Sequence, residues 1–182
     1  MYQNSYVKHR ITSIDDPLFD EVFEIYNTSF PIYEQRPKDD FKVAFSNPDI
    51  RFDVFLDFDM AICALRCAWE RPEFVYLEYL AVAKEKRGDG LGGMLISDFI
   101  TKHQGKDLIL EIDPPQDEIS RKRLAFYEKY GFVTNEHLDY IHPPYTDHGE
   151  SFPLLVLSYG KKLEDSVYSQ FEDYHHNVVL QR

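Results

Sequence analysis

The sequence predicts a mixed α/β (α+β) fold in which a central sheet of six to seven strands is flanked by about four helices. Residues 51–82 contain three extended segments separated by turn signals, a pattern typical of an antiparallel meander. Residues 74–131 then run strand, helix, strand and helix, an order that favours two neighbouring parallel strands. The sheet is therefore expected to combine an antiparallel part with one parallel pair.

The first third of the chain is expected to contribute one strand and two helices. Residues 6–12 are predicted to form the strand, and Asp16-Pro17 fits the start of the first helix. A polar and aromatic loop over residues 30–36 precedes a short helix near residues 38–45. The composition of this loop is more typical of a functional segment than of a spacer.

The later elements follow from the same periodicities. We expect strands near residues 51–56, 60–69 and 74–82, a helix from Leu91, a strand over 108–112, a helix that ends before Gly131, and closing strands near 132–140 and 153–159. A last helix from Asp165 to Tyr174 would dock on the core or on a partner. Because there is no internal repeat or domain boundary, residues 1–182 are predicted to form one domain, with a helical tail over about 163–182.

The composition narrows the class of protein. The 182 residues suffice for one well-buried core. Acidic residues outnumber basic ones by 32 to 20, and no cluster of Lys and Arg is long enough to follow a phosphate backbone, so no nucleic-acid partner is expected. No apolar run approaches the ~20 residues that span a bilayer, and residues 1–5 lack the layout of a signal peptide. We therefore expect a cytoplasmic protein with no membrane partner.

Neither the cysteines nor the histidines form a metal-binding motif. Cys63 and Cys67 lie in a predicted strand, where they are expected to pack. The seven histidines show no zinc-finger or His-Glu-x-x-His spacing, so no metal is expected. His175 and His176, near the end of the chain, are expected on the surface.

The most informative segment is residues 76–95, which is predicted to run from a strand through a glycine-rich turn into a helix. Gly88, Gly90, Gly92 and Gly93 let backbone N–H groups approach an anion, and the N-terminus of the helix adds a partial positive charge. These features predict a pyrophosphate site.

Three kinds of ligand could use such a site. Gly88, Gly90 and Gly93 match the dinucleotide-binding fingerprint. In the dinucleotide fold, however, the first glycine follows the strand almost directly, whereas residues 83–87 intervene here, and no second mononucleotide-binding half follows Ile112. A P-loop is excluded because no Gly-Lys-Ser or Gly-Lys-Thr ends the turn.

The third possibility is an acyl-CoA site. Arg87-Gly88-Asp89-Gly90-Leu91-Gly92 resembles the signature of the GNAT superfamily of acyl-CoA-dependent N-acyltransferases: Arg or Gln, two residues, Gly, one residue, then Gly or Ala. The resemblance covers about residues 74–133. Ser120 departs from the pattern, since many members carry Asn there. His142-Pro143-Pro144-Tyr145 is similar to the Gln-Pro-Pro-Tyr of an uncharacterised bacterial branch.

The resemblance implies the GNAT fold, with a splayed parallel pair of strands at the centre of the sheet, and acetyl-CoA as the cofactor. Leu80-Ala81-Val82 would hydrogen-bond the pantetheine arm, and Arg87 would oppose the charge of the pyrophosphate. The residues expected at the cofactor are Leu80, Ala81, Val82, Arg87, Gly88, Asp89, Gly90, Leu91, Gly92, Gly93, Phe126 and Lys129.

Acetyl transfer to an amine requires a base for the ammonium proton, a polarised carbonyl and a stabilised thiolate. Glu78 is the candidate base, because it lies two residues before Leu80 and would share its strand face. Alternatively, Glu78 is an edge-strand residue paired with Lys or Arg. Glu111 on the neighbouring strand is the second candidate. The resemblance places Tyr127 near the CoA sulfur as the acid; otherwise it is a core aromatic residue.

The acceptor is expected to be a primary amine of a small molecule or peptide, bound across the cleft from CoA. The residues expected there are Phe30, Pro31, Glu34, Glu111 and Tyr145. A cationic amine would suit Glu34 and the aromatic faces. The chain would act as a monomer or a homodimer. Two other functions remain open: an acyl-CoA-binding protein without catalysis, and a dinucleotide-dependent oxidoreductase.

Overall fold

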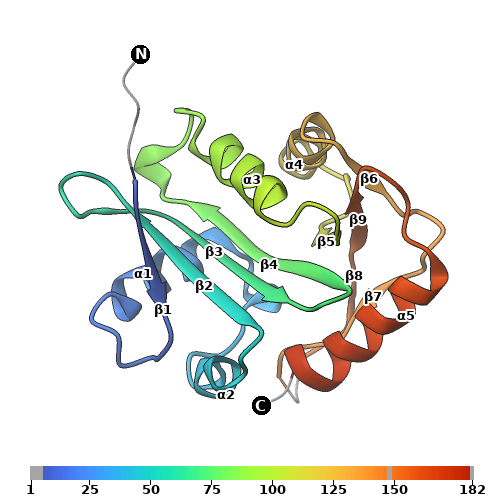
Figure 1. The fold of residues 1–182 in the computed structure, drawn as a ribbon, viewed down its shortest axis with the longest axis horizontal. Coiled ribbons are helices and arrows are strands. Elements are labelled where there is room, and N and C mark those ends of the chain that lie inside the picture. The colour runs from blue at the N-terminus through green and yellow to red at the C-terminus, as the bar shows by residue number, and fades with distance from the viewer. Residues whose placement is uncertain (1–5, 147–148, 181–182) are drawn as a thin grey trace.

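A seven-stranded mixed sheet forms the centre of the molecule (Figure 1). The structure is a computed structural model that describes residues 6–146 and 149–180. The strands lie in the order β1 (Val7–Ile11), β2 (Ile50–Leu56), β3 (Ile62–Glu70), β4 (Phe74–Val82), β5 (Asp107–Ile112), β9 (Leu155–Tyr159) and β6 (Phe132–Thr134). A second, small sheet pairs β7 (Ile141–His142) with β8 (Phe152–Pro153). Among the described strands β4 and β5 alone are parallel, which confirms the predicted fold class.

Helices cover both faces of the sheet. The α-helices of the described residues are α1 (Phe19–Ser29), α2 (Asp40–Ser46), α3 (Leu91–Lys102), α4 (Glu118–Lys129) and α5 (Asp165–Tyr174). Two short 3-10 turns, η1 (Ile32–Glu34) and η2 (Lys84–Lys86), lie in loops, and a π-helical turn, η3 (His175–Val179), continues α5. None of the described helices has the length and apolar character needed to cross a bilayer.

Each face of the sheet has its own hydrophobic core, because successive strand side chains point to opposite faces. On one face, α1, α2 and α5 bury aromatic side chains that include Tyr26, Phe41 and Phe171. On the other face, α3 and α4 bury Phe99 and Tyr127 (Figure 1). The predicted C-terminal helix therefore docks on the core of its own chain.

The strand predicted over residues 132–140 ends early, at Thr134. The next residue, Asn135, is fully buried, and its side chain bonds elsewhere in the fold. Its Nδ2 donates to Ser158 Oγ (2.9 Å), and its Oδ1 accepts from the Leu163 N–H (2.8 Å). These bonds hold the chain as it leaves the sheet, so the alternation that continues to residue 140 does not form a ladder.

A bulge at Glu78 interrupts β4. Tyr79 pairs with Cys67 of β3 and Leu77 pairs with Ala68, so Glu78 has no residue opposite it. The parallel pairing with β5 also stops at Leu77, whereas β4 continues beside β3 to its end. The two central strands therefore part at the bulge, which gives the splayed pair that the sequence predicted.

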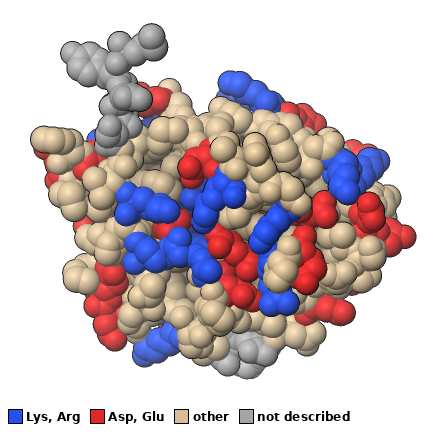
Figure 2. Space-filling model, in the orientation of Figure 1, with Lys and Arg blue, Asp and Glu red and all other residues tan. Residues whose placement is uncertain are grey.

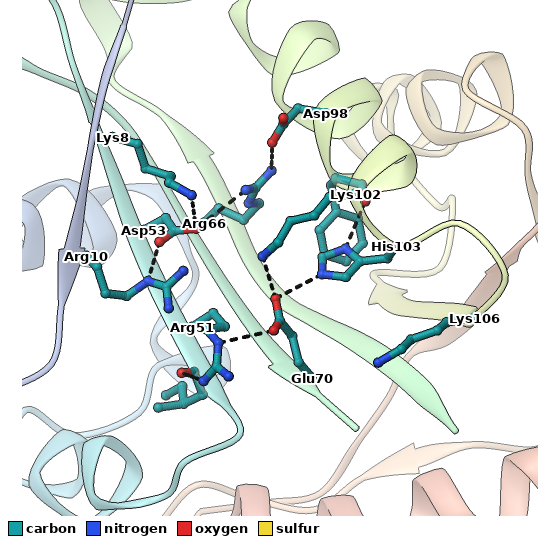
Figure 3. A network of polar contacts seen from close by, with 12 residues as sticks. Lys8, Arg10, Arg51, Asp53, Arg66, Glu70, Asp98, Lys102, His103 and Lys106 are labelled. Carbon is teal, nitrogen blue, oxygen red and sulfur yellow. Dashed lines mark hydrogen bonds and ion pairs between the residues drawn. The ribbon is translucent and has the colours of Figure 1, made fainter. Parts of the chain in front are cut away.

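Charged side chains, rather than a helix, cover the outer face of β1, β2 and β3. Figure 2 shows Lys and Arg side chains among Asp and Glu in the middle of this face. Glu70 of β3 accepts a hydrogen bond from Lys102 (2.7 Å), lies 2.9 Å from His103 Nε2 and pairs with Arg51 (3.1 Å) (Figure 3). A second group of cations surrounds the buried Asp53 (Figure 3). These ion pairs and hydrogen bonds cover the part of the sheet over which no helix lies.

We expect Glu70→Gln to lower the free energy of unfolding near pH 7 by about 2 kcal/mol, because hydrogen bonds to a charged carboxylate are the stronger ones. The hydrogen bond with His103, followed by the hydrogen bond and charge of Lys102, lowers the pKa of Glu70 well below its usual range. The stabilisation is therefore complete above the ordinary glutamate pKa of about 4.3 and is lost as the pH falls further.

Urea unfolding of the two proteins over the acid range measures this difference. Glu85→Gln, at an exposed position in η2, is the control and should match the unaltered chain. If Glu70→Gln and the unaltered chain lost stability in parallel as the pH fell, the network would not stabilise the sheet through Glu70.

Candidate active site

A cavity of about 390 Å³ opens where β4 and β5 part. Its walls come from both strands, from the start of α3, from α4 and from the loop after α1. The lining residues are Ser29, Phe30, Glu34, Leu77, Glu78, Leu80, Ala81, Val82, Arg87, Gly92, Leu110, Glu111, Ile112, Arg123, Phe126 and Tyr127. The structure thus brings together most of the residues that the sequence predicted for the cofactor, the catalysis and the acceptor.

The glycine-rich turn leads directly into α3 at one end of the cavity. Gly90 adopts a left-handed conformation (φ 80°) at the N-cap, and the first intrahelical hydrogen bond runs from Met94 N–H to the Gly90 carbonyl (3.1 Å). The N–H groups of the three residues between them have no intrahelical partner, as at every helix start. They are available to an anion at the cavity mouth.

Gly93 serves packing rather than the cavity. A Cβ atom at this position would lie 1.9 Å from the Tyr130 hydroxyl, so the Tyr130 side chain packs against α3 where glycine leaves room for it. Gly92, one residue earlier, lines the cavity, where a Cβ would have ordinary 3.7 Å contacts with Phe126 and Val82.

The other residues expected at the cofactor divide into two groups. Leu80, Ala81, Val82, Arg87, Gly92 and Phe126 line the cavity, whereas Gly88, Asp89, Gly90, Leu91, Gly93 and Lys129 do not. The Arg87 Nε donates to the Val82 carbonyl (2.9 Å), which ties the arginine to the end of β4. The Lys129 ammonium lies over the ring of Tyr130, 5.7 Å from its centroid.

Glu78 does not share a strand face with Leu80, contrary to the sequence prediction, because the bulge breaks the alternation of β4. Its side chain is fully buried, and both of its oxygens accept hydrogen bonds. Oε1 accepts from Arg36 Nη2 (2.9 Å) and from the Tyr145 hydroxyl (3.0 Å), and Oε2 accepts from Trp69 Nε1 (2.7 Å). The alternative that the sequence left open, a glutamate paired with an arginine, fits this arrangement.

Arg36 is a residue of the site that the sequence analysis did not single out. It follows η1 in the loop after α1 and is buried, although arginine is rarely buried without a partner. Besides Glu78, its Nη2 donates to the Val179 carbonyl in η3 (2.6 Å). One guanidinium therefore joins the loop after α1, the bulge of β4 and the C-terminal tail.

Glu111 of β5 presents a free oxygen beside the cavity. Its Oε2 accepts a hydrogen bond from the Tyr76 hydroxyl (2.8 Å), while its buried Oε1 has no partner among the described residues. Burial raises the pKa of Glu111 to about 7, although hydrogen bonds from Tyr140 and Tyr76 oppose that effect. A carboxylate in this state can accept a proton near neutrality.

Glu34 of η1 adds a second carboxylate to the cavity wall. Burial, followed by the charge of Asp113, raises its pKa to about 8, and its Oε1 has no partner among the described residues. Arg123 Nη1 donates to Asp113 (2.8 Å), so this end of the cavity holds two acids and one base. The wall of the cavity at this end is therefore polar.

Of the remaining residues that the sequence predicted for the site, some line the cavity and others lie outside it. Tyr127 lines the cavity, and burial raises its pKa to about 12, so its hydroxyl keeps its proton at neutral pH. Phe30 also lines the cavity, whereas Pro31 does not. Tyr145 donates to Glu78 and lines a neighbouring cavity of about 490 Å³ with Arg36.

His175 is fully buried, so its expected surface position was wrong. The tail folds back over the sheet, and η3 turns the His175 ring towards Tyr76 and Tyr140. His142 of β7 is also buried and lies against the same ring, with centroids 4.8 Å apart. His176 is exposed, as expected.

The strand order of the sheet argues against a dinucleotide-binding fold. A dinucleotide fold needs several parallel strands, and the described strands contain the single parallel pair β4–β5. Instead, a glycine-rich turn and a parted central pair form one cavity. This combination defines the fold of the GNAT acyl-CoA transferases.

Comparisons with known proteins agree with that class. A family model described as "Acetyltransferase (GNAT) domain" matches residues 53–134. A curated relative from Bacillus subtilis, named "Putative acetyltransferase YjbC", is 37% identical over 73 residues, which cover 39% of this chain and 37% of that protein. The matched region thus spans little more than a third of the relative.

Two solved structures extend the likeness to nearly the whole chain. A GNAT-family protein from Bacteroides thetaiotaomicron has a TM-score of 0.84 at 23% identity, over 96% of this chain and 98% of its own. A GNAT-family acetyltransferase from Elizabethkingia anophelis with acetyl-CoA bound has a TM-score of 0.59 at 16% identity, over 86% and 98%. The likeness to GNAT-family proteins therefore lies in the sequence of residues 53–134 and in the fold of nearly the whole chain.

We predict that Glu78→Gln lowers the free energy of unfolding by about 3–5 kcal/mol, because it leaves the Arg36 guanidinium buried without a counter-charge. Replacing both residues together, as Arg36→Met with Glu78→Leu, should recover part of this loss. The exposed pair of Lys122 and Glu118 on α4 provides the control: Glu118→Gln should change stability by less than about 1 kcal/mol. Denaturant unfolding measures all three, and an equal effect of Glu78→Gln and Glu118→Gln would contradict the prediction.

Proposed function

We propose that this protein transfers the acetyl group of acetyl-CoA to a primary amine. The observation that carries the proposal is the cavity between the parted ends of β4 and β5, with the glycine-rich start of α3 at its mouth. A long cofactor with an anionic end and an extended polar arm fits such a cavity. The acetyl-CoA bound to the structural neighbour from Elizabethkingia anophelis supports this choice of cofactor.

The cofactor would lie between the start of α3 and the free edge of β4. Backbone N–H groups at the helix start and the Arg87 guanidinium would hold the pyrophosphate. Because the pairing of β4 with β5 ends at Leu77, the edge of residues 80–82 that faces away from β3 could hydrogen-bond the pantetheine arm, apart from the Val82 carbonyl, which accepts from Arg87. One of these N–H groups would also polarise the thioester carbonyl.

Glu111 is the base that the geometry favours. An attacking amine must lose a proton, and Glu111 has an oxygen without a hydrogen bond beside the cavity. Glu78 was the first candidate from the sequence, but its two oxygens already accept hydrogen bonds from Arg36, Tyr145 and Trp69. We therefore assign the proton transfer to Glu111 and the shaping of β4 to Glu78.

The leaving group completes the reaction. The amine nitrogen attacks the thioester carbon, the ammonium proton passes to Glu111, and the carbon–sulfur bond breaks to release a thiolate. Tyr127 would stabilise this thiolate by donating a hydrogen bond from its hydroxyl, whose raised pKa keeps the proton on the oxygen, and the thiolate would leave the site with a proton from solvent. Phe30 and Glu34 would face the acceptor, which is an amine of a small molecule or a peptide.

The experiment is a thiol-release assay with acetyl-CoA and a panel of amines that includes diamines, amino acids and short peptides. Glu111→Gln should lower kcat by about 10²- to 10⁴-fold with its best acceptor while acetyl-CoA affinity stays the same, because it removes the base and leaves the cofactor contacts. Glu128→Gln, at an exposed position on α4, is the matched control and should keep full activity.

Two results would redirect the proposal. If Glu111→Gln stayed active while a folded Glu78→Gln did not, the base would be Glu78. If the chain bound acetyl-CoA but released no thiol with any amine, it would be an acyl-CoA-binding protein without catalysis.

A further inference from the structure

A buried cluster of two histidines and a carboxylate lies beside the active-site cavity. It consists of Glu111 of β5, His142 of β7 and His175 of η3, and one candidate ligand atom from each lies within 4.8 Å of the other two. Glu111 also lines the cavity, whereas the two histidines do not. The side chains of the three residues are almost inaccessible to solvent.

The hydrogen bond of His142 fixes its tautomer. Its Nδ1 contacts the Pro143 carbonyl, and a carbonyl oxygen only accepts, so Nδ1 carries the proton. In the neutral ring, Nε2 then carries the lone pair. That atom lies 3.8 Å from Glu111 Oε2.

His175 presents a free lone pair in the same way. Its Nδ1 lies 3.3 Å from the Tyr140 hydroxyl, and its buried Nε2 has no hydrogen-bond partner among the described residues. A neutral imidazole has one N–H, and a proton on Nε2 would be a buried donor without an acceptor among the described residues. With the proton on Nδ1, His175 donates to the Tyr140 oxygen, which leaves a lone pair on Nε2.

Three acceptor groups thus lie close together. Glu111 Oε1 and His175 Nε2 are buried without a partner among the described residues, and His142 Nε2 lies 3.8 Å from Glu111 Oε2. Buried acceptors without a donor are rare in proteins and cost about 1–3 kcal/mol each. A cation would satisfy all three at once.

We propose that Glu111, His142 and His175 bind a divalent transition-metal ion, with Zn²⁺ as the best match. Two imidazole nitrogens and one carboxylate oxygen are a donor set that suits Zn²⁺. Each ligand is also oriented by an outer partner: the Pro143 carbonyl for His142, and the hydroxyls of Tyr140 and Tyr76 for His175 and Glu111.

The sequence expected no metal because its three ligands come from separate elements. Glu111, His142 and His175 are more than 30 residues apart in the chain, so no short spacing links them. Their meeting depends on η3, which folds the tail back and buries His175. The metal site therefore follows from the arrangement of the three side chains in the folded chain and not from their spacing in the sequence.

If the proposed function is right, a bound metal ion would inhibit the enzyme. An ion held by Glu111 would occupy the oxygen that takes the proton of the amine. The metal-free chain is then the active form, Zn²⁺ inhibits acetyl transfer, and a chelator restores it.

The test is calorimetric titration of the full chain, without a histidine tag, with Zn²⁺ in the absence of acetyl-CoA. One ion should bind per chain. His175→Gln and His142→Gln should each weaken binding by at least about 100-fold, and Tyr140→Phe, which removes an outer partner, by about 10- to 100-fold. His176→Gln is the matched control: the same substitution one residue away, at an exposed position, should keep the affinity.

A second readout does not depend on the variants folding. Co²⁺ bound to two nitrogens and one oxygen in a closed site gives strong visible absorption, and Zn²⁺ should remove it by displacement. Binding of no ion by the unaltered chain would overturn the proposal. So would binding that His175→Gln and His142→Gln leave unchanged while both variants unfold thermally like the unaltered chain.

The metal titration and the acetyl-transfer assay can give opposite results. If acetyl-CoA binds and acetyl is transferred but Zn²⁺ does not bind, the metal site is wrong and the enzyme stands. If Zn²⁺ binds as described but the chelated chain transfers no acetyl group, the metal site stands and the proposed function is wrong.

Discussion

The buried ion pair between Arg36 and Glu78 is the interaction on which the arrangement of the site depends. Glu78 is the extra residue of the bulge in β4, and the bulge marks the point where β4 leaves β5. If β4 ran straight, its ladder with β5 would continue and the cavity would close. Arg36, Trp69 and Tyr145 hold the Glu78 carboxylate in place and thereby hold the bulge.

The same ion pair connects parts of the chain that are distant in sequence. Arg36 lies in the loop after α1, while its second hydrogen bond reaches the Val179 carbonyl in the C-terminal turn. A buried ion pair contributes little net stability, because desolvation of both charges offsets their attraction. We infer that its main contribution is to fix these segments relative to each other, since either charge alone would be costly in the core.

The sequence predicted the parts of the fold and site that local signals specify. Strand alternation and helical spacing indicated the meander and the parallel pair, and the glycine-rich turn indicated the start of α3 and the neighbouring cofactor residues. The bulge had no such signal, because a bulge of this kind needs no glycine, and it reversed the face of Glu78. The burial of Arg36 depends on contacts 42 and 143 residues away along the chain, and that of His175 on a contact with Tyr140, 35 residues away, which no periodicity reveals.

The central claim is that acetyl-CoA binds in the cavity between β4 and β5, and calorimetric titration with acetyl-CoA tests it most directly. Gly92 lines the cavity at the start of α3, so Gly92→Glu would place a bulky anion where the cofactor should lie. Met94→Glu adds the same charge to an exposed position of the same helix and is the matched control. We expect the unaltered chain and Met94→Glu to bind one acetyl-CoA and Gly92→Glu to bind none. Equal binding by all three, or no binding by the unaltered chain, would contradict this claim.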